Sequence, residues 1–281
     1  MKQHLIKVFG ERNTGTRAIL QMIRAMPNLT TVVPDLKKPP KIKEMQRRIK
    51  DRFRDKWLDE YMEAFSFENR NRVGGVAAWT HAAPYFDQSY AKAGANVVFV
   101  TKNPYSWMVS LYKHPHHAKG ISCEVLEQFV DYPWLTLPKD RVEMVLNSPM
   151  CLWNKKLRAY ADFQDICDIP VYQFSFESFV RLPVKTMTAA LDSFGIDSTG
   201  LAAIPIAAKR KILMADELPD YYNKEQWRQG LTRQSVALIN QHTDWQVAKR
   251  FGYEKLDPKQ FPIEINQEYQ SRLPSDFSSK V

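Results

Sequence analysis

The chain has 281 residues, of which 44% are hydrophobic and 25% are charged, and its net charge is +9. This composition is ordinary for a globular protein and excludes a low-complexity chain. The positive charge suits an anionic cofactor or an acidic acceptor, and equally a nucleic acid. No basic stripe interleaved with aromatic residues and no nucleic-acid motif occurs in the sequence, so we expect no nucleic-acid partner.

The cysteines and the hydropathy pattern indicate a compartment. The three cysteines, Cys123, Cys151 and Cys167, are unevenly spaced and form no CxxC pair. This favours free thiols in a reducing compartment over a disulfide framework or a zinc site. The sequence shows no signal peptide and no apolar run of about eighteen residues. We therefore expect a cytoplasmic protein with no integral membrane contact.

The first predicted elements are a strand, a loop and a helix within residues 5–25. An apolar run reaches Gly10, four polar residues follow, and a helical pattern extends from Thr16 to Ala25. Glycines such as Gly10 and Gly15 let the backbone approach an anion closely. The N–H groups of the loop and the positive end of the helix can then bind that anion.

The spacing of Gly10 and Gly15 is similar to that of a Walker loop. However, Thr16 and Arg17 follow Gly15, where a Walker loop needs a lysine and then a serine or threonine. This departure disfavours hydrolysis of ATP or GTP, while a phosphate-bearing ligand is still expected. An ordinary strand-to-helix turn would show the same pattern.

Residues 28–40 are predicted to be irregular, and a long amphipathic helix follows at 42–65. Its apolar residues recur at steps of three and four, and its outer face is basic. Two readings are open: a helix packed on the core with a solvated face, or a lid or acceptor-binding insertion at about 40–70. Residues 74–79 then predict a short strand that ends at Thr80 and His81.

A second strand, turn and helix follow at 96–112. The strand covers 96–101, Lys102 stands at its end, and Ser110 lies eight residues later inside the helix. Beyond it, three histidines (His114, His116 and His117) surround Pro115. No helical i, i+4 pair is possible across this proline, and no acidic residue is close, so we favour a loop near an acceptor over a metal site.

The rest of the chain alternates helices with one further strand. We expect a helix from Trp153 to about Phe163, a strand at 170–174, and a helix at about 184–194. A helical pair then covers 224–251. Residues 1–256 are thus predicted to form one domain, and 257–281 a loosely docked tail. The basic run Lys209, Arg210 and Lys211 could reach a phosphate or form a solvated face.

Four segments together resemble motifs of the sulfotransferases that use 3′-phosphoadenosine 5′-phosphosulfate (PAPS). Residues 10–18 are similar to the Gly-x-Arg-Lys-Gly-Gly-Thr-Arg-Ala loop of glycan (heparan-type) members. Residues 102–104 with Ser110 resemble the family's Arg-Asn-Pro…Ser. Thr80 and His81 with Pro84 resemble Thr-His-x-Pro, and residues 176–179 resemble Tyr-Glu-Asp-Leu. The order and spacing of these motifs extend the resemblance from about residue 5 to about residue 255.

The resemblance implies a P-loop-like sulfotransferase fold of the α/β class, with three layers and a mostly parallel central sheet flanked by helices. It implies transfer of a sulfuryl group from PAPS to a hydroxyl or amine, with adenosine 3′,5′-bisphosphate as the product and no metal. The acceptor would be a small molecule or a glycan, and a carbohydrate is expected because the first loop looks most like glycan members. The alternatives are a PAPS-binding protein without turnover and a P-loop-type nucleotide kinase.

The resemblance also implies residue roles. The first loop would hold the 5′-phosphosulfate, Lys102 and Ser110 would hold the 3′-phosphate, and Phe176 would pack against adenine. His81 would be the general base, and Arg12 would stabilise the leaving phosphate. The first-loop residues concerned are Arg12, Asn13, Thr14, Gly15, Thr16 and Arg17. Glu177 is expected to orient a loop.

The chain departs from the family at two positions. Asn13 stands where the family loop has a lysine, and Trp79 stands where a basic residue often lies two positions before the histidine. Both departures remove a cation near the transferring group, which favours the alternative of binding without turnover.

Overall fold

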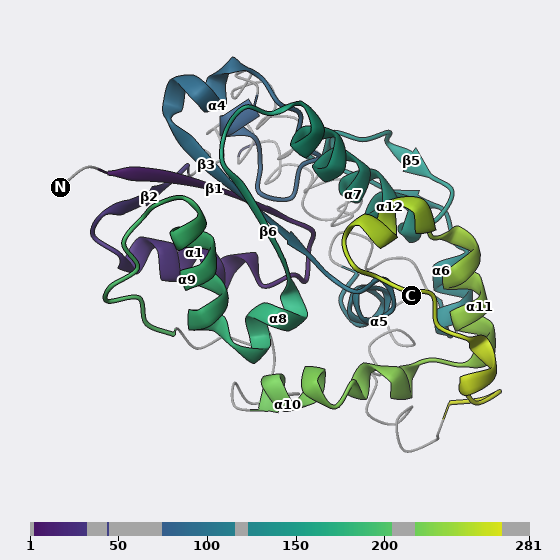
Figure 1. Cartoon of the computed structure of the whole chain (residues 1–281). Coiled ribbons are helices and arrows are strands. Elements are labelled where there is room, and N and C mark those ends of the chain that lie inside the picture. The colour runs from purple at the N-terminus through teal and green to yellow at the C-terminus, as the bar shows by residue number, and fades with distance from the viewer. Residues whose placement is uncertain (1–2, 33–43, 45–74, 116–122, 204–216, 266–281) are drawn as a thin grey trace.

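The computed structural model describes residues 3–32, 44, 75–115, 123–203 and 217–265 (Figure 1). The predicted basic helix at 42–65 lies outside the described residues, apart from Glu44. The basic run at 209–211, His116 and His117, and the end of the predicted tail also lie outside them.

Four parallel strands form the central sheet in the order β2-β1-β3-β6. They are β1 (His4–Gly10), β2 (Leu29–Thr31), β3 (Ala95–Thr101) and β6 (Val171–Ser175). The chain places β2 on one side of β1, and then crosses to the other side to add β3 and β6. The strand order therefore reverses between β1 and β3, and open α/β sheets bind ligands beside such a reversal, at the carboxyl ends of the strands.

Helices cover both faces of this sheet, which confirms the predicted three-layer α/β fold with a mostly parallel sheet. Helices α1 (Thr16–Ala25) and α9 (Pro183–Ser193) lie on one face, and α7 (Pro149–Ile166) lies on the other (Figure 1). Both strands that flank the reversal, β1 and β3, are almost entirely buried. Their near-continuous apolar sequences are typical of strands that are covered on both faces.

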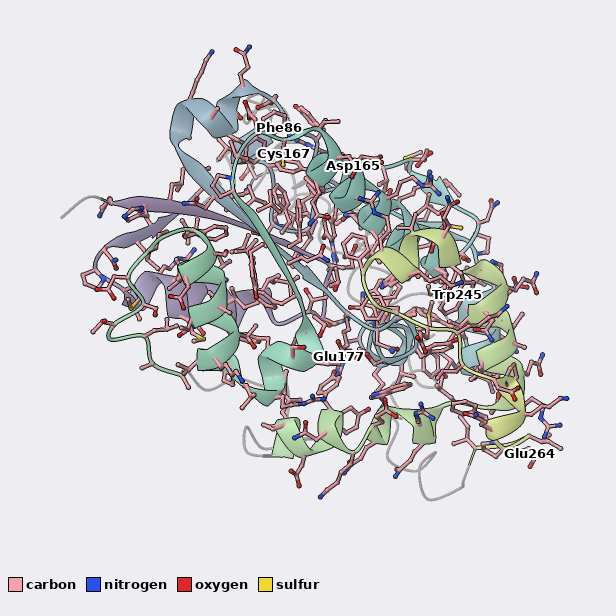
Figure 2. All side chains as sticks on the ribbon, viewed as in Figure 1. Phe86, Asp165, Cys167, Glu177, Trp245 and Glu264 are labelled. Atoms are coloured by element: carbon pink, nitrogen blue, oxygen red, sulfur yellow. The ribbon has the colours of Figure 1, made fainter. Side chains whose placement is uncertain are left out.

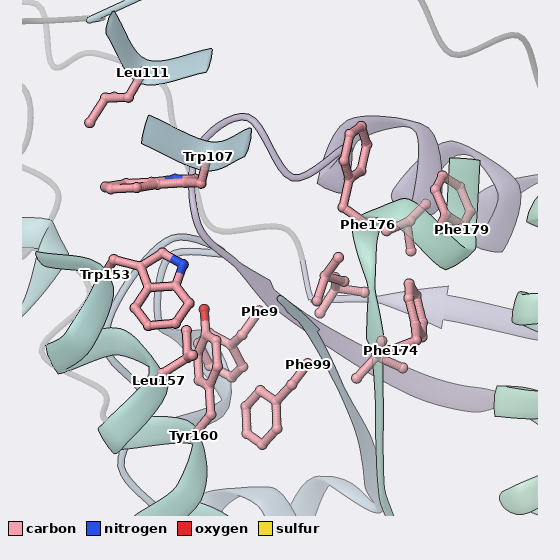
Figure 3. Close-up of a cluster of buried hydrophobic side chains, with 14 of the residues drawn as sticks. Phe9, Phe99, Trp107, Leu111, Trp153, Leu157, Tyr160, Phe174, Phe176 and Phe179 are labelled. Carbon is pink, nitrogen blue, oxygen red and sulfur yellow. The ribbon is translucent and has the colours of Figure 1, made fainter. Parts of the chain in front are cut away.

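Aromatic side chains fill the layer between the sheet and α7 (Figure 3). Phe99 stacks on Tyr160 with a centroid separation of 4.6 Å, and Phe163 meets Phe99 edge-on at 5.3 Å. On the opposite face of the sheet, Phe174 on β6 stacks on Phe179 with a centroid separation of 6.0 Å. Each fully buried large apolar side chain contributes about 1.5–3 kcal/mol, so this packing fixes the strands whose ends carry the loops.

Helix α4 (Gln88–Ala93) packs against β3 and the 3-10 helix at Gly75–Ala77. The other elements extend the fold beyond β6 and around α5 (Figures 1 and 2). They are α5 (Pro104–Lys113), α6 (Leu126–Val130), β4 (Trp134–Leu135), β5 (Val145–Leu146), α8 (Phe176–Arg181), α10 (Glu217–Asn223), α11 (Arg233–His242) and α12 (Trp245–Arg250). Short 3-10 helices lie at Gly75–Ala77, Pro138–Asp140, Gln226–Gly230 and Pro258–Gln260. In the described ranges, no helix is both long and apolar enough to cross a bilayer, and no three His, Cys, Asp or Glu side chains form a metal site.

The predicted strand at 74–79 is wrong, because the described part of it forms the 3-10 helix Gly75–Ala77. Gly75 has a left-handed φ of +56°, and the side chains of Asp87 and Ser89 occupy the space in which a Cβ atom would lie. The N–H of Val76 donates to Ser89 Oγ at 3.0 Å. The backbone of this segment is thus held by side chains that precede and begin α4, and not by a neighbouring strand.

Three further boundaries differ from the sequence-based expectation. The segment predicted to be irregular contains β2, which pairs with β1. Helix α7 begins at Pro149, four residues before the predicted start, because proline suits the first helical position. In the predicted C-terminal tail, residues 257–265 include the buried Phe261, and the carbonyl of Pro262 accepts a hydrogen bond from the N–H of Arg233.

Candidate active site

The two predicted anion loops meet at the carboxyl edge of the sheet. The strands that lead into them are adjacent, since Gly10 on β1 pairs with Val100 on β3. Two contacts join the loops: Lys102 Nζ donates to the carbonyl of Asn13 at 3.2 Å, and Trp107 Nε1 donates to the carbonyl of Arg12 at 3.1 Å. A ligand with two anionic groups could therefore reach both loops at once.

The first loop has the backbone shape of an anion cradle. Asn13 and Gly15 both have left-handed φ values, of +66° and +69°, and asparagine is among the few non-glycine residues that tolerate this region. Helix α1 follows with no side-chain cap and no acidic residue in its first turn. The N–H groups of Ala18 and Ile19 donate to the carbonyl of Gly15, so an anion here would use the N–H groups of Thr16 and Arg17 and the helix dipole.

The first-loop side chains differ in exposure. Arg12, Thr14 and Thr16 are buried, Asn13 and Gly15 are partly buried, and Arg17 is exposed. Thr14 Oγ1 donates to the carbonyl of Glu11 at 2.5 Å and closes the turn. Of the residues predicted to hold the 5′-phosphosulfate, Arg17 is the one whose side chain lies in solvent.

Lys102 lies in a buried cage between the two loops, with 1% of its surface exposed. Its ammonium donates to Ser110 Oγ at 2.8 Å, to Tyr222 Oη at 2.7 Å and to the carbonyl of Asn13. Lys102 and Ser110, which the resemblance assigns to the same phosphate, thus lie within hydrogen-bond distance of each other. The three hydrogen bonds use all three donors of a lysine, and an added anion would have to replace one of them.

Aromatic rings enclose the ammonium of Lys102. Its Nζ lies 4.7 Å from the ring centroid of Phe176 and 5.0 Å from that of Tyr222. The ring of Phe176 also packs against the first loop, because a Cβ atom added to Gly15 would lie 2.6 Å from it. Phe176 therefore contacts both anion loops.

Burial lowers the pKa values of the two lysines at this cage. Desolvation lowers the pKa of Lys102 to about 7, and the carboxylate of Glu177 partly opposes this effect. Desolvation also lowers the pKa of Lys113 to about 8. Charge repulsion from Lys113 is a further cause of the shift at Lys102. The positive charges of Lys102 and Lys113 repel each other in the free protein. A multiply charged anion bound near them would therefore stabilise both charged forms.

Glu177 organises the second loop. One of its carboxylate oxygens accepts from the N–H of Asn103 at 3.2 Å and from Ser106 Oγ at 2.8 Å. The side chain of Asn103 in turn caps α5 by accepting from the N–H groups of Tyr105 and Ser106. Figure 2 places Glu177 at the start of α8, where the chain leaves β6 beside α5. This agrees with the expectation that Glu177 orients a loop.

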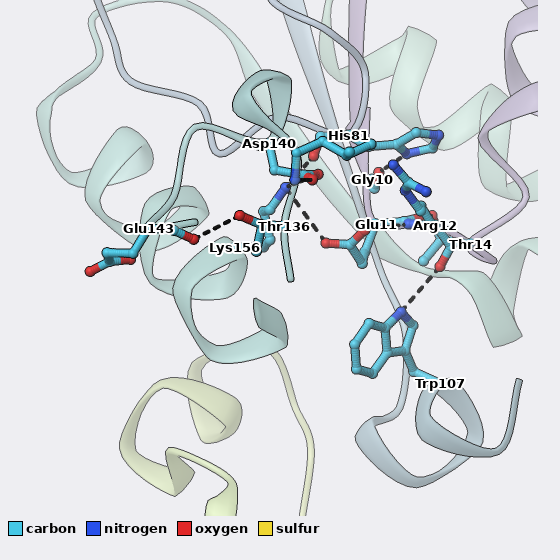
Figure 4. A network of polar contacts seen from close by, with 11 residues as sticks. Gly10, Glu11, Arg12, Thr14, His81, Trp107, Thr136, Asp140, Glu143 and Lys156 are labelled. Atoms are coloured by element: carbon cyan, nitrogen blue, oxygen red, sulfur yellow. Dashed lines mark hydrogen bonds and ion pairs between the residues drawn. The ribbon is translucent and has the colours of Figure 1, made fainter. Parts of the chain in front are cut away.

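His81 lies against the first loop (Figure 4). Its Nδ1 is 2.5 Å from the carbonyl of Gly10, and the N–H of Gly10 donates to the carbonyl of Thr80 at 3.0 Å. A carbonyl can only accept, so we assign the proton of the neutral ring to Nδ1. Nε2 then keeps its lone pair and can accept a proton from another molecule.

Burial of the imidazole lowers the pKa of His81 to about 3, although the hydrogen bond to Gly10 acts in the opposite direction. The positive charges of Arg12 and Lys156 lower the pKa further. The ring is therefore neutral at physiological pH, which a general base requires. This pKa lies far below the ordinary histidine value of about 6.5, and an anion bound nearby would raise it.

A buried ionic network holds the His81 segment in place (Figure 4). Lys156 on α7 is fully buried and donates to the carbonyl of His81 and to Asp140 Oδ1, the latter at 3.2 Å. Its Nζ also lies 3.7 Å from Glu11 Oε2, and burial raises the pKa of Glu11. A second buried lysine, Lys7, donates to the carbonyl of Ala78.

Sequence reasoning missed three residues of this site. Tyr222 and Lys139 come from segments with no recognised motif, whereas Lys156 lies in a predicted helix but was given no role. All three reach the site through contacts that are distant in sequence. Of the three, Lys156 alone had a local sequence signal. Its spacing from Trp153 and Tyr160 places it on the buried face of α7, where a charged residue is unusual.

The ring of Trp79 is in contact with two cationic side chains and with His81. The guanidinium of Arg12 lies 5.0 Å from its ring centroid and the ammonium of Lys139 lies 4.4 Å from it. The ring of His81 meets the indole edge-on at 4.7 Å. The position at which the family often has a basic residue thus holds an aromatic ring with two cations beside it.

Three solved structures are similar to this chain. A sulfotransferase from Alicyclobacillus acidocaldarius is 13% identical, with 90% of this chain and 98% of that chain covered and a TM-score of 0.46. Sulfotransferase STF9 from Mycobacterium avium is 14% identical, with 91% and 78% covered and a TM-score of 0.43. The sulfotransferase domain from the curacin biosynthetic pathway is 10% identical, with 91% and 99% covered and a TM-score of 0.40.

No protein-family model and no curated protein matches the sequence. At these identities and TM-scores, the structural likeness by itself assigns neither an activity nor a ligand to the chain.

Proposed function

We propose that this protein is a sulfotransferase that moves a sulfuryl group from PAPS to a hydroxyl or amine, with a carbohydrate as the expected acceptor. The observation that carries the proposal is the meeting of two anion loops where the strand order reverses. One loop precedes the N-terminus of α1, and the other contains the pair Lys102 and Ser110. PAPS has two anionic ends and an adenosine between them.

The residues present fit such a nucleotide. The first loop offers backbone N–H groups to the 5′-phosphosulfate, and the buried side chain of Arg12 lies in the same loop. Lys102 and Ser110 offer donors to the 3′-phosphate, with Lys113 as a second nearby charge. Phe176 contacts both loops and can pack against the adenosine.

A 3′-phosphate would take the place of one partner of Lys102. Asn13 and Ser110 belong to the two loops themselves, whereas Tyr222 belongs to α10, which packs on α8. We expect the phosphate to replace the hydroxyl of Tyr222 on the ammonium. That hydroxyl could then donate to the phosphate.

Bound PAPS supplies the sulfuryl group, and the protein supplies position, charge and a base. Sulfuryl transfer resembles phosphoryl transfer, in which positioning and charge stabilisation provide most of the rate. His81 Nε2 accepts the proton of the acceptor hydroxyl, since Nδ1 is held by Gly10. Arg12 and the amide groups at the start of α1 stabilise the charge that develops on the leaving phosphate.

The alternative is a protein that binds the nucleotide without turnover. The asparagine at position 13 and the low pKa of His81 favour it. A nucleotide kinase is less supported, because Gly15 is followed by threonine and arginine and not by a Walker lysine.

Thermal unfolding tests the proposal. A ligand at about 100 times its Kd stabilises the native state by about 2.7 kcal/mol, which is a shift of several degrees in Tm. We expect this shift with adenosine 3′,5′-bisphosphate and none with ATP and magnesium. The reverse pattern would favour the kinase. Transfer of labelled sulfate from PAPS across a panel of glycans and small hydroxyl compounds then separates turnover from binding alone.

A further inference from the structure

The 3-10 helix Pro138–Asp140 lies against the segment that contains His81. The N–H of Ala83 donates to the carbonyl of Asp140 at 2.8 Å. Lys156 joins the carbonyl of His81 to Asp140 Oδ1, and the N–H of Leu137 donates to Asp140 Oδ2 at 2.8 Å. These hydrogen bonds fix the position of Asp140, and therefore of the residue before it.

That residue is Lys139, and its ammonium group packs against the ring of Trp79, which also contacts Arg12 and His81. Lys139 is 9% exposed, and its ammonium lies 4.4 Å from the centroid of Trp79. The same indole lies 5.0 Å from the guanidinium of Arg12 and 4.7 Å from the ring of His81. The face of tryptophan attracts cations and offsets part of the cost of removing them from water. The fold thus holds a second cation against the same indole that contacts Arg12 and His81.

We propose that Lys139 supplies the second positive charge at the reacting centre, as a donor to an oxygen of the sulfuryl group. The inference rests on the sulfotransferase function proposed above. The resembled loop has a lysine where this chain has the asparagine at position 13, and Lys139, 126 positions later, reaches the indole that also contacts Arg12 of that loop.

The chemistry needs such a charge. The acceptor oxygen forms a bond to sulfur while the bond from sulfur to the 5′-phosphate oxygen breaks, and the phosphate keeps the electron pair. The acceptor proton goes to His81 Nε2. Lys139 transfers no proton, because its ammonium only donates a hydrogen bond to the sulfuryl oxygens. A cation held in place before the reaction is more effective in a buried site than in water.

The test compares two nucleotides that differ only by the sulfuryl group, so it needs no acceptor. Calorimetry measures the binding of PAPS and of adenosine 3′,5′-bisphosphate to the wild type, Lys139→Met, Lys139→Arg and Lys259→Met. Lys259 is a matched control, because it also follows a proline in a three-residue 3-10 helix but is exposed. Lys139→Met keeps the length and apolar stem of the side chain, and its Tm is measured alongside.

We expect Lys139→Met to weaken PAPS about tenfold, the value of one charge-assisted hydrogen bond, and to change bisphosphate affinity less than twofold. Lys139→Arg should recover most of the loss, and Lys259→Met should match the wild type. Equal affinities of Lys139→Met and wild type for both nucleotides would overturn the inference and leave the proposed function standing. So would an equal loss for both nucleotides. A wild type that binds neither nucleotide would overturn the proposed function and the inference together.

Discussion

Lys102→Met is the substitution that best separates a ligand-binding role of the buried cage from a structural one. Methionine keeps the length of the side chain and its contact with the rings of Phe176 and Tyr222. It removes the positive charge and the hydrogen bonds to Ser110, Tyr222 and Asn13.

The expected effects on stability and on binding differ. Burial lowers the pKa of Lys102 from 10.5 to about 7, which corresponds to roughly 3–5 kcal/mol against the charged form. Loss of that cost offsets the loss of three hydrogen bonds at about 1 kcal/mol each. The free energy of unfolding of Lys102→Met should therefore stay within about 2 kcal/mol of the wild type. Affinity for adenosine 3′,5′-bisphosphate should fall by about 1.5–3 kcal/mol, or roughly 10- to 150-fold.

Calorimetry with two ligands makes this measurement. Adenosine 5′-phosphosulfate has no 3′-phosphate, so its affinity should change less than threefold in Lys102→Met. Lys185→Met, on the exposed part of α9, is the control and should bind both ligands as the wild type does. An equal loss for both ligands, or a large loss of stability with unchanged affinity, would refute the assignment of Lys102 to the 3′-phosphate.

Four further predictions concern the same site. Bisphosphate affinity should fall as pH rises through 7 to 8, because Lys102 and Lys113, with pKa values of about 7 and 8, lose their protons there; titrations from pH 6 to 9 should show this slope in the wild type and a flatter one in Lys102→Met. His81→Asn keeps a donor for the Gly10 carbonyl but no basic nitrogen, so turnover should fall about 10²- to 10⁴-fold with nucleotide affinity within a few-fold; a smaller loss, or the same loss in His242→Asn, would exclude His81 as the base. Gly15→Ala should destabilise by about 1–3 kcal/mol more than Gly195→Ala, since both glycines have a left-handed φ but only the Cβ atom at position 15 would meet Phe176; equal unfolding curves would contradict this. Lys156→Met should lower the free energy of unfolding by about 3–5 kcal/mol, because the buried carboxylates of Glu11 and Asp140 lose their cation. Lys155→Met, at the partly exposed neighbouring residue, should lower it by less than about 1 kcal/mol.

The sequence was most informative where the signal is local. The strand, loop and helix around Gly10 and Gly15 are encoded within about twenty residues, and so is the turn that carries Lys102. Apolar runs that end in glycine or proline signal such units directly. Ser110 lies in the second turn of α5, eight residues after Lys102 at the end of β3, and the structure joins the two side chains by a hydrogen bond.

The contacts that complete the site are long-range, and for this reason the sequence did not reveal them. Tyr222 is 120 residues from Lys102, and Lys156 is 75 residues from His81. Neither partner lies in a motif, and their meeting depends on the strand order and on how α7 and α10 pack. The strand predicted at 74–79 failed for a similar reason, because Asp87 and Ser89 hold Gly75 in a turn.

The low pKa of His81 also depends on the folded state. An unperturbed histidine side chain has a pKa of about 6.5. Burial and the charges of Arg12 and Lys156 lower its pKa to about 3. The free protein should therefore lose stability as pH falls from 6.5 toward 3, since the unfolded chain binds a proton that the native ring does not.

A crystal structure of this protein with adenosine 3′,5′-bisphosphate would show which loop holds each phosphate. We expect the 5′-phosphate on the amide groups between Gly10 and Thr16, and the 3′-phosphate on Lys102 and Ser110. We also expect that the hydroxyl of Tyr222 no longer contacts the ammonium of Lys102. A nucleotide bound away from the β1 and β3 loops, or bound with its two phosphates exchanged, would contradict the account.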